Sequence, residues 1–265
     1  MTGRQGDTRL IEAARAGCLQ DARRALDRGA NPNAKDSWNR TALMFACQSG
    51  NTQLVGLLLG KGARLASKDK NMGDRSGGRR PLHYAAANGS AEVVRILREA
   101  GADVDAPAND GETALTLAIQ NNHAGIVKLL LDAGADPSTT TQGASALEIA
   151  VLCGHDHIVR TLLAHSASPD VRSPQGTTPL MDAIFRNDIT SAALLLDAGA
   201  NADAVDENGF TPLRFAAATG SADAVQLLLG RGADAKRVNK YRQSALAMAQ
   251  REGSEAVASL LRLQV

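Results

Sequence analysis

Residue types that bind metal ions come together at one place, where Cys153, His155 and His157 fall within five residues. A thiolate and two imidazoles would supply three of the four ligands of a tetrahedral zinc site. No second group of cysteines or histidines follows that would complete the set. We therefore expect no metal, and we keep a metal-dependent activity around these three residues as an alternative.

The sequence offers little for nucleophilic or phosphate chemistry. It contains no Gly-x-Ser-x-Gly motif, no Walker motif and no dinucleotide-binding fingerprint. The glycine-rich stretch 73–78 follows no apolar strand and leads into a short alanine-rich helix, unlike a phosphate-binding loop. Serine, histidine and aspartate occur at no spacing that suggests a catalytic triad. The sequence therefore predicts neither an enzyme nor a cofactor.

The composition favours many short helices over one thick core. Apolar residues make up 44% of the 265 residues, aromatic residues only 3%, and there are 25 glycines. Lys and Arg number 29 against 28 Asp and Glu, so the net charge does not indicate a nucleic acid or an acidic membrane. The first residues carry charges instead of an apolar leader, and the three cysteines lie far apart. We expect a cytoplasmic protein with reduced thiols, no Sec signal peptide and no membrane segment, and we leave export by another route open.

A repeat sets the positions of all these residues. A short motif ending in leucine recurs eight times, at intervals of 33, 39, 33, 32, 33, 33 and 33 residues. These motif leucines are Leu10, Leu43, Leu82, Leu115, Leu147, Leu180, Leu213 and Leu246. Each period reads as a short alanine-rich helix, capped by Thr or Ser and ended by Gly or Asn, and a leucine-rich second helix ended by Gly-Ala. Turn-forming residues then join one period to the next as a projecting finger.

The pattern resembles the ankyrin repeat, through Thr-Pro-Leu at 178–180 and 211–213 and Leu-Leu-x-x-Gly-Ala-Asp at 130–136. The resemblance covers Asp7 to Leu263. It implies an all-α ankyrin-repeat solenoid of helix-turn-helix units with projecting β-hairpin or finger loops, whose fingers and first helices line a concave face. We expect a single domain over 1–265, which leaves no room for a catalytic domain. Its units fall at approximately 7–34, 35–67, 68–106, 107–139, 140–171, 172–204, 205–237 and 238–265.

Two units depart from the pattern. In the fifth, Ser166 replaces the glycine of Gly-Ala, so a serine must adopt a left-handed conformation at a cost of about 1 kcal/mol. The interval before Leu147 is one residue short, which trims that finger. The third unit holds six extra residues, which fit at about Met72–Gly77 and enlarge a basic finger. That unit also has Arg80 where the others have the capping Ser or Thr.

The repeat phase sorts the seven aromatic residues. Three lie two residues after a motif leucine and are predicted to be core: Phe45, Tyr84 and Phe215. Trp38 and Tyr241 lie five before it, at finger tips, and Phe210 lies three before it, also on a finger. Phe185 lies five after it, facing the groove. Each of these four rings either packs on an adjacent finger or is exposed. Because all four fall on the concave side of the repeat, we expect them to contact a binding partner.

Charge is banded along the chain. Residues 61–80 hold seven bases against two acids, and residues 231–242 hold five against one. Between them, residues 103–112 hold four acids and no base. Such bands suit a protein with complementary bands better than a polyanion, which favours a continuous basic stripe. Nucleic-acid binding through the basic fingers 61–80 and 231–242 is kept as an alternative.

We therefore expect a non-enzymatic protein-protein interaction module, monomeric on its own, that acts as an adaptor, inhibitor or scaffold. Its partner is another protein, bound on the concave face formed by fingers and first helices. The expected contacts combine the four rings with four arginines as charged contacts. They are Trp38, Arg40, Arg75, Arg79, Phe185, Arg186, Phe210 and Tyr241.

Overall fold

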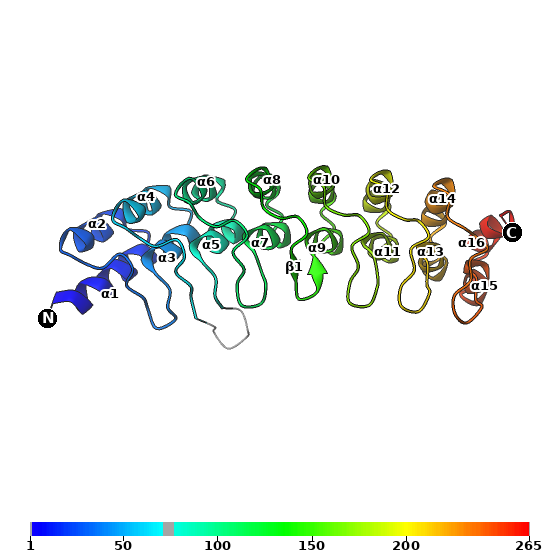
Figure 1. The fold of residues 1–265 in the computed structure, drawn as a ribbon, viewed down its shortest axis with the longest axis horizontal. Coiled ribbons are helices and arrows are strands. Elements are labelled where there is room, and N and C mark those ends of the chain that lie inside the picture. Colours follow the sequence, from blue (N-terminus) through cyan, green and yellow to red (C-terminus); the bar gives the residue numbers. More distant parts are fainter. Residues whose placement is uncertain (1, 71–76, 265) are drawn as a thin grey trace. The chain divides into compact units, whose positions relative to one another are not determined.

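The computed structural model describes residues 2–70 and 77–264, and the described chain is built almost wholly of short helices (Figure 1). The predicted all-α class, with helices in pairs, is confirmed. The chain divides into two compact units, Met1–Gln142 and Gly143–Val265, and we describe each by itself as unit 1 and unit 2. The eight repeat boundaries and the single domain stay predictions.

Unit 1 holds four helix pairs and ends in the strand β1 (Thr140–Thr141). Its first helices are α1 (Thr2–Arg15), α3 (Ala42–Gln48), α5 (Pro81–Asn88) and α7 (Ala114–Gln120). Its second helices are α2 (Leu19–Asp27), α4 (Thr52–Gly60), α6 (Ala91–Glu99) and α8 (Ala124–Asp132). First helices pack on first helices and second helices on second helices, so the unit has two layers. Figure 1 shows its fingers on the side of the first-helix layer that faces away from the second helices.

Unit 2 begins with the strand β2 (Ala144–Ser145) and repeats the two-layer arrangement. Its first helices are α9 (Ala146–Leu152), α11 (Pro179–Phe185), α13 (Pro212–Thr219) and α15 (Ala245–Arg251). Its second helices are α10 (Asp156–Ala164), α12 (Ile189–Asp197), α14 (Ala222–Gly230) and α16 (Glu255–Arg262). In each unit, we call the surface formed by the fingers and the first helices its finger face.

The core of each unit lies between its two helix layers. Seven of the eight motif leucines are buried, and Leu246 of the last helix pair is half-buried because no further helix pair follows it within the described residues. Leucines of the second helices, such as Leu58 and Leu130, complete the core and are fully buried. Each such side chain stabilises the fold by about 1.5–3 kcal/mol, and it does so through contacts with neighbouring pairs.

The predicted helix ends are confirmed in most repeats. Thr41 Oγ1 accepts the backbone N–H of Met44 (3.4 Å), and Thr113, Ser145, Thr178, Thr211 and Ser244 cap their helices in the same way. The first helices are followed by residues with φ between 56° and 83°, namely Gly50, Gly89, Asn122, Gly154, Asn187 and Gly220. Ser166 has φ 64°, so the predicted left-handed serine is also present.

The predicted cap of the first repeat is wrong. Thr8 lies inside α1, where its Oγ1–H donates to the carbonyl oxygen of Arg4 (3.0 Å), because this helix extends back to Thr2. An interior threonine satisfies its hydroxyl on the preceding turn instead of capping the helix. The periodic motif therefore locates Leu10 correctly and misplaces the start of the helix that carries it.

A ladder of side-chain to backbone hydrogen bonds joins neighbouring repeats within each unit. In unit 1, Asn33 Oδ1 accepts the N–H of Arg64 (2.7 Å), and Asp105 Oδ1 accepts the N–H of Asp136 (2.9 Å). Unit 2 has two equivalent bonds, from Asn201 to Asp170 (2.9 Å) and from Asp234 to Asp203 (3.0 Å). The acceptor stands four residues after the first residue of the Gly-Ala turn. At this position the second repeat has Ala66, whose side chain has no acceptor, so that bond to the third repeat is missing from the ladder of the described residues.

Candidate functional site

Five of the described fingers are each closed by a polar side chain at the base. Asp36 Oδ1 accepts the N–H groups of Trp38 (2.9 Å) and Arg40 (2.8 Å), while its own N–H donates to the carbonyl oxygen of Arg40 (3.0 Å). Ser173, Asp206 and Asn239 make the same pattern in unit 2. Side chains bonding their own backbone two residues on are a common device for fixing turns. The bases of these fingers are therefore held in a defined conformation.

Asp69 closes the enlarged third finger in this way. Its Oδ1 accepts the N–H of Arg79 (2.8 Å), and its N–H donates to the carbonyl oxygen of Arg79 (3.1 Å). The bond spans ten residues where that of Asp36 to Arg40 spans four, which supports the predicted place of the six extra residues. Of the predicted insertion Met72–Gly77, only Gly77 is described. Residues 72–76, with the expected contact residue Arg75, lie outside the described residues.

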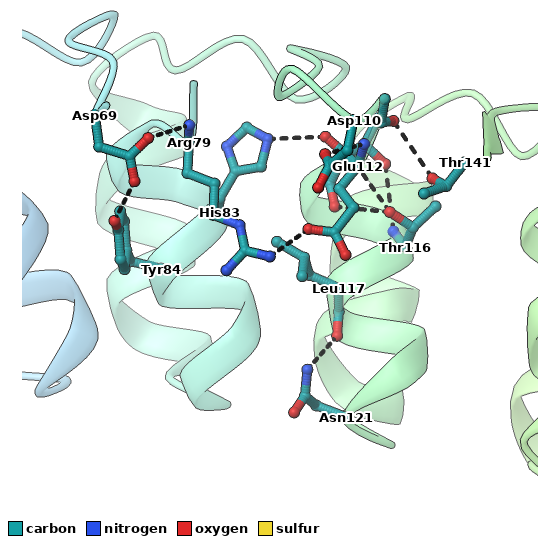
Figure 2. Close-up of polar contacts among 12 residues, drawn as sticks. Asp69, Arg79, His83, Tyr84, Asp110, Glu112, Thr116, Leu117, Asn121 and Thr141 are labelled. Carbon is teal, nitrogen blue, oxygen red and sulfur yellow. Dashed lines mark hydrogen bonds and ion pairs between the residues drawn. The ribbon is translucent and has the colours of Figure 1, made fainter. Parts of the chain in front are cut away.

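The base of this finger is bonded to the helices beneath it (Figure 2). The hydroxyl of Tyr84 donates to Asp69, and the guanidinium of Arg79 forms an ion pair with Glu112 of the next finger. Burial, and then the nearby Asp69 carboxylate, raise the pKa of the Tyr84 hydroxyl above its usual range. The predicted contact residue Arg79 is thus held in place by neighbours on both sides.

His83 completes this network. Its Nδ1 accepts the N–H of Arg80 (3.2 Å), and its Nε2–H donates to the carbonyl oxygen of Glu112 (3.1 Å). The histidine therefore bonds within its own repeat and to the next one. Its own backbone N–H, which a Ser or Thr at position 80 would cap, donates to the carbonyl oxygen of Arg80 instead (3.0 Å). The ring is 2% exposed, and burial lowers the pKa of His83 to about 4, because a charged ring would lose solvation and the Nδ1 acceptor. The side chain of Arg80 is left free of capping and pairs with Asp103 (3.3 Å).

Phe45 is buried, as predicted, but its cover is unusual. The guanidinium of Arg40 lies over the ring at 4.7 Å from the centroid, and that of Arg15 lies at 5.0 Å. Both arginines also pair with Asp36, at 3.0 Å and 3.4 Å. Arg40, another predicted contact residue, is therefore already engaged with an aromatic ring and a carboxylate of its own unit.

Three phenylalanines form a row on the finger face of unit 2. Phe215 meets Phe185 edge-on, with centroids 6.4 Å apart, and it meets Phe210 at 6.2 Å. The core prediction is therefore wrong for Phe215, and also for Tyr84, since both are half-buried. Side chains two residues after the motif leucine point along the finger face, where burial depends on their neighbours. Phe210 is half-buried too, under the guanidinium of Arg214 at 3.9 Å from its centroid.

The other expected contacts are exposed. Phe185 is 65% exposed, Tyr241 63% and Trp38 39%, and Arg186 is exposed beside Phe185. Sequence reasoning missed a further apolar side chain, Leu152, which is 43% exposed. It stands five residues after its motif leucine, as Phe185 does, so the repeat phase carried a signal for it.

Two charged side chains near the row of rings have unpaired buried atoms. Asp182 Oδ2 has no hydrogen-bond partner, and burial, and then the charge of Glu148, raise the pKa of Asp182 to about 7. Arg214 donates through Nη2 to Gln243 (2.9 Å), but its Nε and Nη1 have no partner. Burial, and then Arg251, lower the pKa of Arg214. Unit 2 therefore has aromatic rings beside charged side chains whose buried atoms lack hydrogen-bond partners.

The group Cys153, His155 and His157 does not gather as metal ligands. The two imidazole centroids are 6.3 Å apart, and among the described residues no cluster of three or more Cys, His, Asp or Glu is suited to a metal ion. Cys153 is an exposed free thiol at the end of α9. Cys47 is buried, and burial raises the pKa of its thiol.

Several bases of the basic fingers are paired with acids of the neighbouring repeat. Lys61 pairs with Asp27 (3.0 Å) and Arg231 with Asp197 (2.8 Å), in addition to the pairs made by Arg79 and Arg80. Such pairing breaks up the positive field that a polyanion would require. In the portion of the chain that the structure covers, no helix combines the length and the apolar character needed to cross a bilayer.

Comparison with known proteins identifies the repeat. A family model described as "Ankyrin repeats (3 copies)" matches residues 10–108, 65–141, 101–173, 138–206 and 180–264. The transient receptor potential cation channel subfamily A member 1 homolog of Caenorhabditis elegans is 31% identical over 117 residues, which are 44% of this chain and 9% of that protein. An ankyrin repeat domain-containing protein of Stachybotrys chartarum is 40% identical over 106 residues, 40% of this chain and 5% of that protein.

A shorter relative matches over most of its own length. Cyclin-dependent kinase 4 inhibitor B of Rattus norvegicus is 33% identical over 105 residues, which are 40% of this chain and 76% of the inhibitor. By contrast, the match spans less than a tenth of the channel homolog and of the fungal protein. The similarity to these larger proteins therefore concerns only a small part of each.

Proposed function

Because the chain belongs to the ankyrin repeat family, we propose that it is a non-enzymatic adaptor, inhibitor or scaffold whose protein partner binds over its fingers and first helices. Ankyrin repeats indicate a protein-interaction module, and the proposal adds the face that is used. The rat relative is named as an inhibitor of a kinase. Inhibition by binding is thus one of the three roles that we propose for this chain.

The position of the exposed apolar side chains carries this proposal. Within the described residues, six large apolar side chains are exposed, and five of them lie on fingers or first helices: Trp38, Leu152, Phe185, Val238 and Tyr241. The sixth, Leu263, directly follows α16. Exposed rings lose contact with water when a partner covers them, and Trp and Tyr are enriched where binding energy is concentrated. If this surface only faced solvent, there would be no advantage in placing most of the exposed apolar side chains on it.

The proposed contacts fall into two groups. Trp38, Phe185, Arg186 and Tyr241 have exposed side chains and are proposed as direct anchors. Three further residues are part-buried and engaged within their units, so we propose them as contacts at the rim: Arg40, Arg79 and Phe210. Arg75 remains a proposed contact on the basis of charge alone. Partner identity is not part of the proposal.

The test compares two triple variants. Trp38, Phe185 and Tyr241 are changed together to alanine, and the matched control changes three exposed residues of second helices, namely Gln53, Arg160 and Gln226. Proteins captured from the producing cells are identified by mass spectrometry, and the affinity of the purified partner is then measured. We expect the first variant to bind at least about tenfold more weakly and the control to bind normally. Equal loss in both variants would show that the partner uses another surface.

A further inference from the structure

Two exposed apolar side chains occupy equivalent positions on neighbouring first helices of unit 2. Leu152 and Phe185 both lie five residues after their motif leucines, on α9 and α11, and these helices pack against each other. They are 43% and 65% exposed. On the α13 side, Phe215 meets Phe185 edge-on. Unit 2 thus carries large apolar side chains that are exposed or half-buried on three successive first helices.

Asp182 lies one helical turn before Phe185, on the same side of α11, and introduces an uncompensated acid into this surface. Its Oδ2 is buried and has no hydrogen-bond partner. Burying a carboxylate oxygen without a donor is costly. The Asp182 side chain as a whole is only half-buried, so a donor from outside can reach the carboxylate and relieve this penalty. The arrangement calls for a positively charged donor that arrives together with apolar contacts.

The charged groups around Asp182 do not supply this donor. From α9, Glu148 adds a second acid, and its pKa is raised by burial. From α11 itself, Arg186 exerts only an electrostatic effect on Asp182. The one charged side chain of α13, Arg214, is stacked on Phe210 and bonded to Gln243. On α12, Asp197 is occupied by Arg231.

We propose that the patch formed by Leu152, Asp182, Phe185 and Phe215 is a docking site for a basic, apolar segment of a protein partner. A lysine or arginine of that segment donates to Asp182, and an adjacent apolar side chain packs on Phe185 and Leu152. The inference rests on the proposed protein-binding function and names the chemistry of the partner at one place. The faces of Phe185 and Phe215 favour a cation over an anion here as well. An acidic segment or a nucleic acid would be repelled by Asp182 and Glu148 and would bring no donor.

The titration of Asp182 gives this docking a signature. Burial raises the pKa of Asp182 to about 7, and a bound cation favours the ionised carboxylate. Binding of the basic segment therefore releases a proton when it starts from the protonated acid. The affinity should rise between about pH 6 and pH 8, and this rise should disappear in Asp182→Asn, whose amide does not titrate.

The experiment uses the full chain and a phage-displayed library of short random peptides. After selection, the most enriched peptide is synthesised together with a copy in which its base is replaced by glutamate. We expect enrichment of Lys or Arg beside Leu, Met or Phe, and about tenfold weaker binding to Asp182→Asn and to Phe185→Ala. Asp223→Asn, which removes an exposed acid from the second helix α14, is the matched control and should bind like the wild type.

A charge exchange tests the pairing directly. Asp182→Lys should lose the basic peptide and regain affinity for the copy that carries glutamate, whereas a role in structure alone would give no such recovery. Enrichment of acidic or uncharged peptides, or equal binding to wild type and Asp182→Asn, would overturn the docking proposal and leave the protein-binding function standing. A selection without binders would also overturn it, and the triple-variant capture described above decides the general function separately.

Discussion

Asp69 Oδ1 accepts the backbone N–H of Arg79 at 2.8 Å, across ten residues, and so reproduces the bond by which Asp36 closes a finger over four. When the two fingers are aligned on Asp69 and Asp36, Lys70 corresponds to Ser37. Gly78, with φ 79°, then corresponds to Asn39, with φ 59°. The repeat is therefore complete without residues 71–76. The third finger is an ordinary finger with a segment added inside its closing bond.

Deleting residues 71–76 should leave the fold intact. Closure entropy changes slowly with loop length, so we expect the free energy of unfolding to change by about 1 kcal/mol or less. Chemical denaturation of the two proteins measures this directly. Asp69→Ala is the comparison, because it removes the acceptor of both Arg79 and Tyr84 and should cost more than the deletion. A deletion more harmful than Asp69→Ala would show that the added segment contributes to packing.

Acid should weaken unit 1 through His83. The pKa of His83 is lowered from 6.5 to about 4, so the folded state takes up this proton only at a lower pH than the unfolded state does. Stability is therefore fully present above about pH 6.5 and is lost as the pH falls toward 4, by about 2 kcal/mol. His83→Gln keeps an acceptor for the Arg80 N–H without a titrating ring, and should flatten this loss in denaturant titrations. His157→Gln, at an exposed site, should leave it unchanged.

Asp182 should have the opposite dependence on pH. Its pKa is raised from 3.8 to about 7, so between these values the unfolded state releases a proton that the folded state keeps. The contribution of protonated Asp182 to the free energy of unfolding is therefore fully present below about pH 4. It is lost as the pH rises through 7. We expect Asp182→Asn to be more stable than the wild type by about 1–2 kcal/mol at pH 8, after allowance for solvent screening, and equally stable near pH 4. A difference that does not vary with pH would contradict the assignment.

Ser166→Gly should stabilise unit 2. Ser166 has φ 64°, a conformation that glycine adopts without the strain caused by a Cβ atom. We expect a gain of about 0.5–1 kcal/mol in the free energy of unfolding, because the relief of strain exceeds the added freedom of the unfolded chain. Gly199→Ala, at the equivalent turn with φ 90°, is the reverse change and should destabilise. If Ser166→Gly is neutral, the strain at this turn is absorbed elsewhere.

Much of the fold follows from the repeat alone. The motif leucine, the capping hydroxyl and the left-handed residue after each first helix occur at fixed phases, and each has a local physical cause. Thr8 shows where such reasoning fails, since the length of the first helix is decided by residues that precede the repeat. His83 shows the reverse, because it stands where other repeats have Met44, Thr116 or Glu148, and its ring still accepts the backbone N–H at the start of its helix.

The finger face was less predictable than the helices. Phe45, Tyr84 and Phe215 share one phase, yet only Phe45 is buried, because Arg15 and Arg40 happen to cover it. Arg15 belongs to the preceding repeat, and the phase of Phe45 alone does not reveal such cover. The same holds for Asp182, since its missing partner becomes visible only when every neighbouring charge is placed.

The ladder between repeats has a mechanical consequence for unit 1. A force that spreads neighbouring fingers apart is borne first by short, directional bonds such as that between Asn33 and Arg64, and only afterwards by the softer packing of helices. At Ala66 this row of ties has a gap. The unit is therefore more compliant beside its enlarged finger than where Asp105 ties the next repeat, and elastic deformation concentrates at that joint.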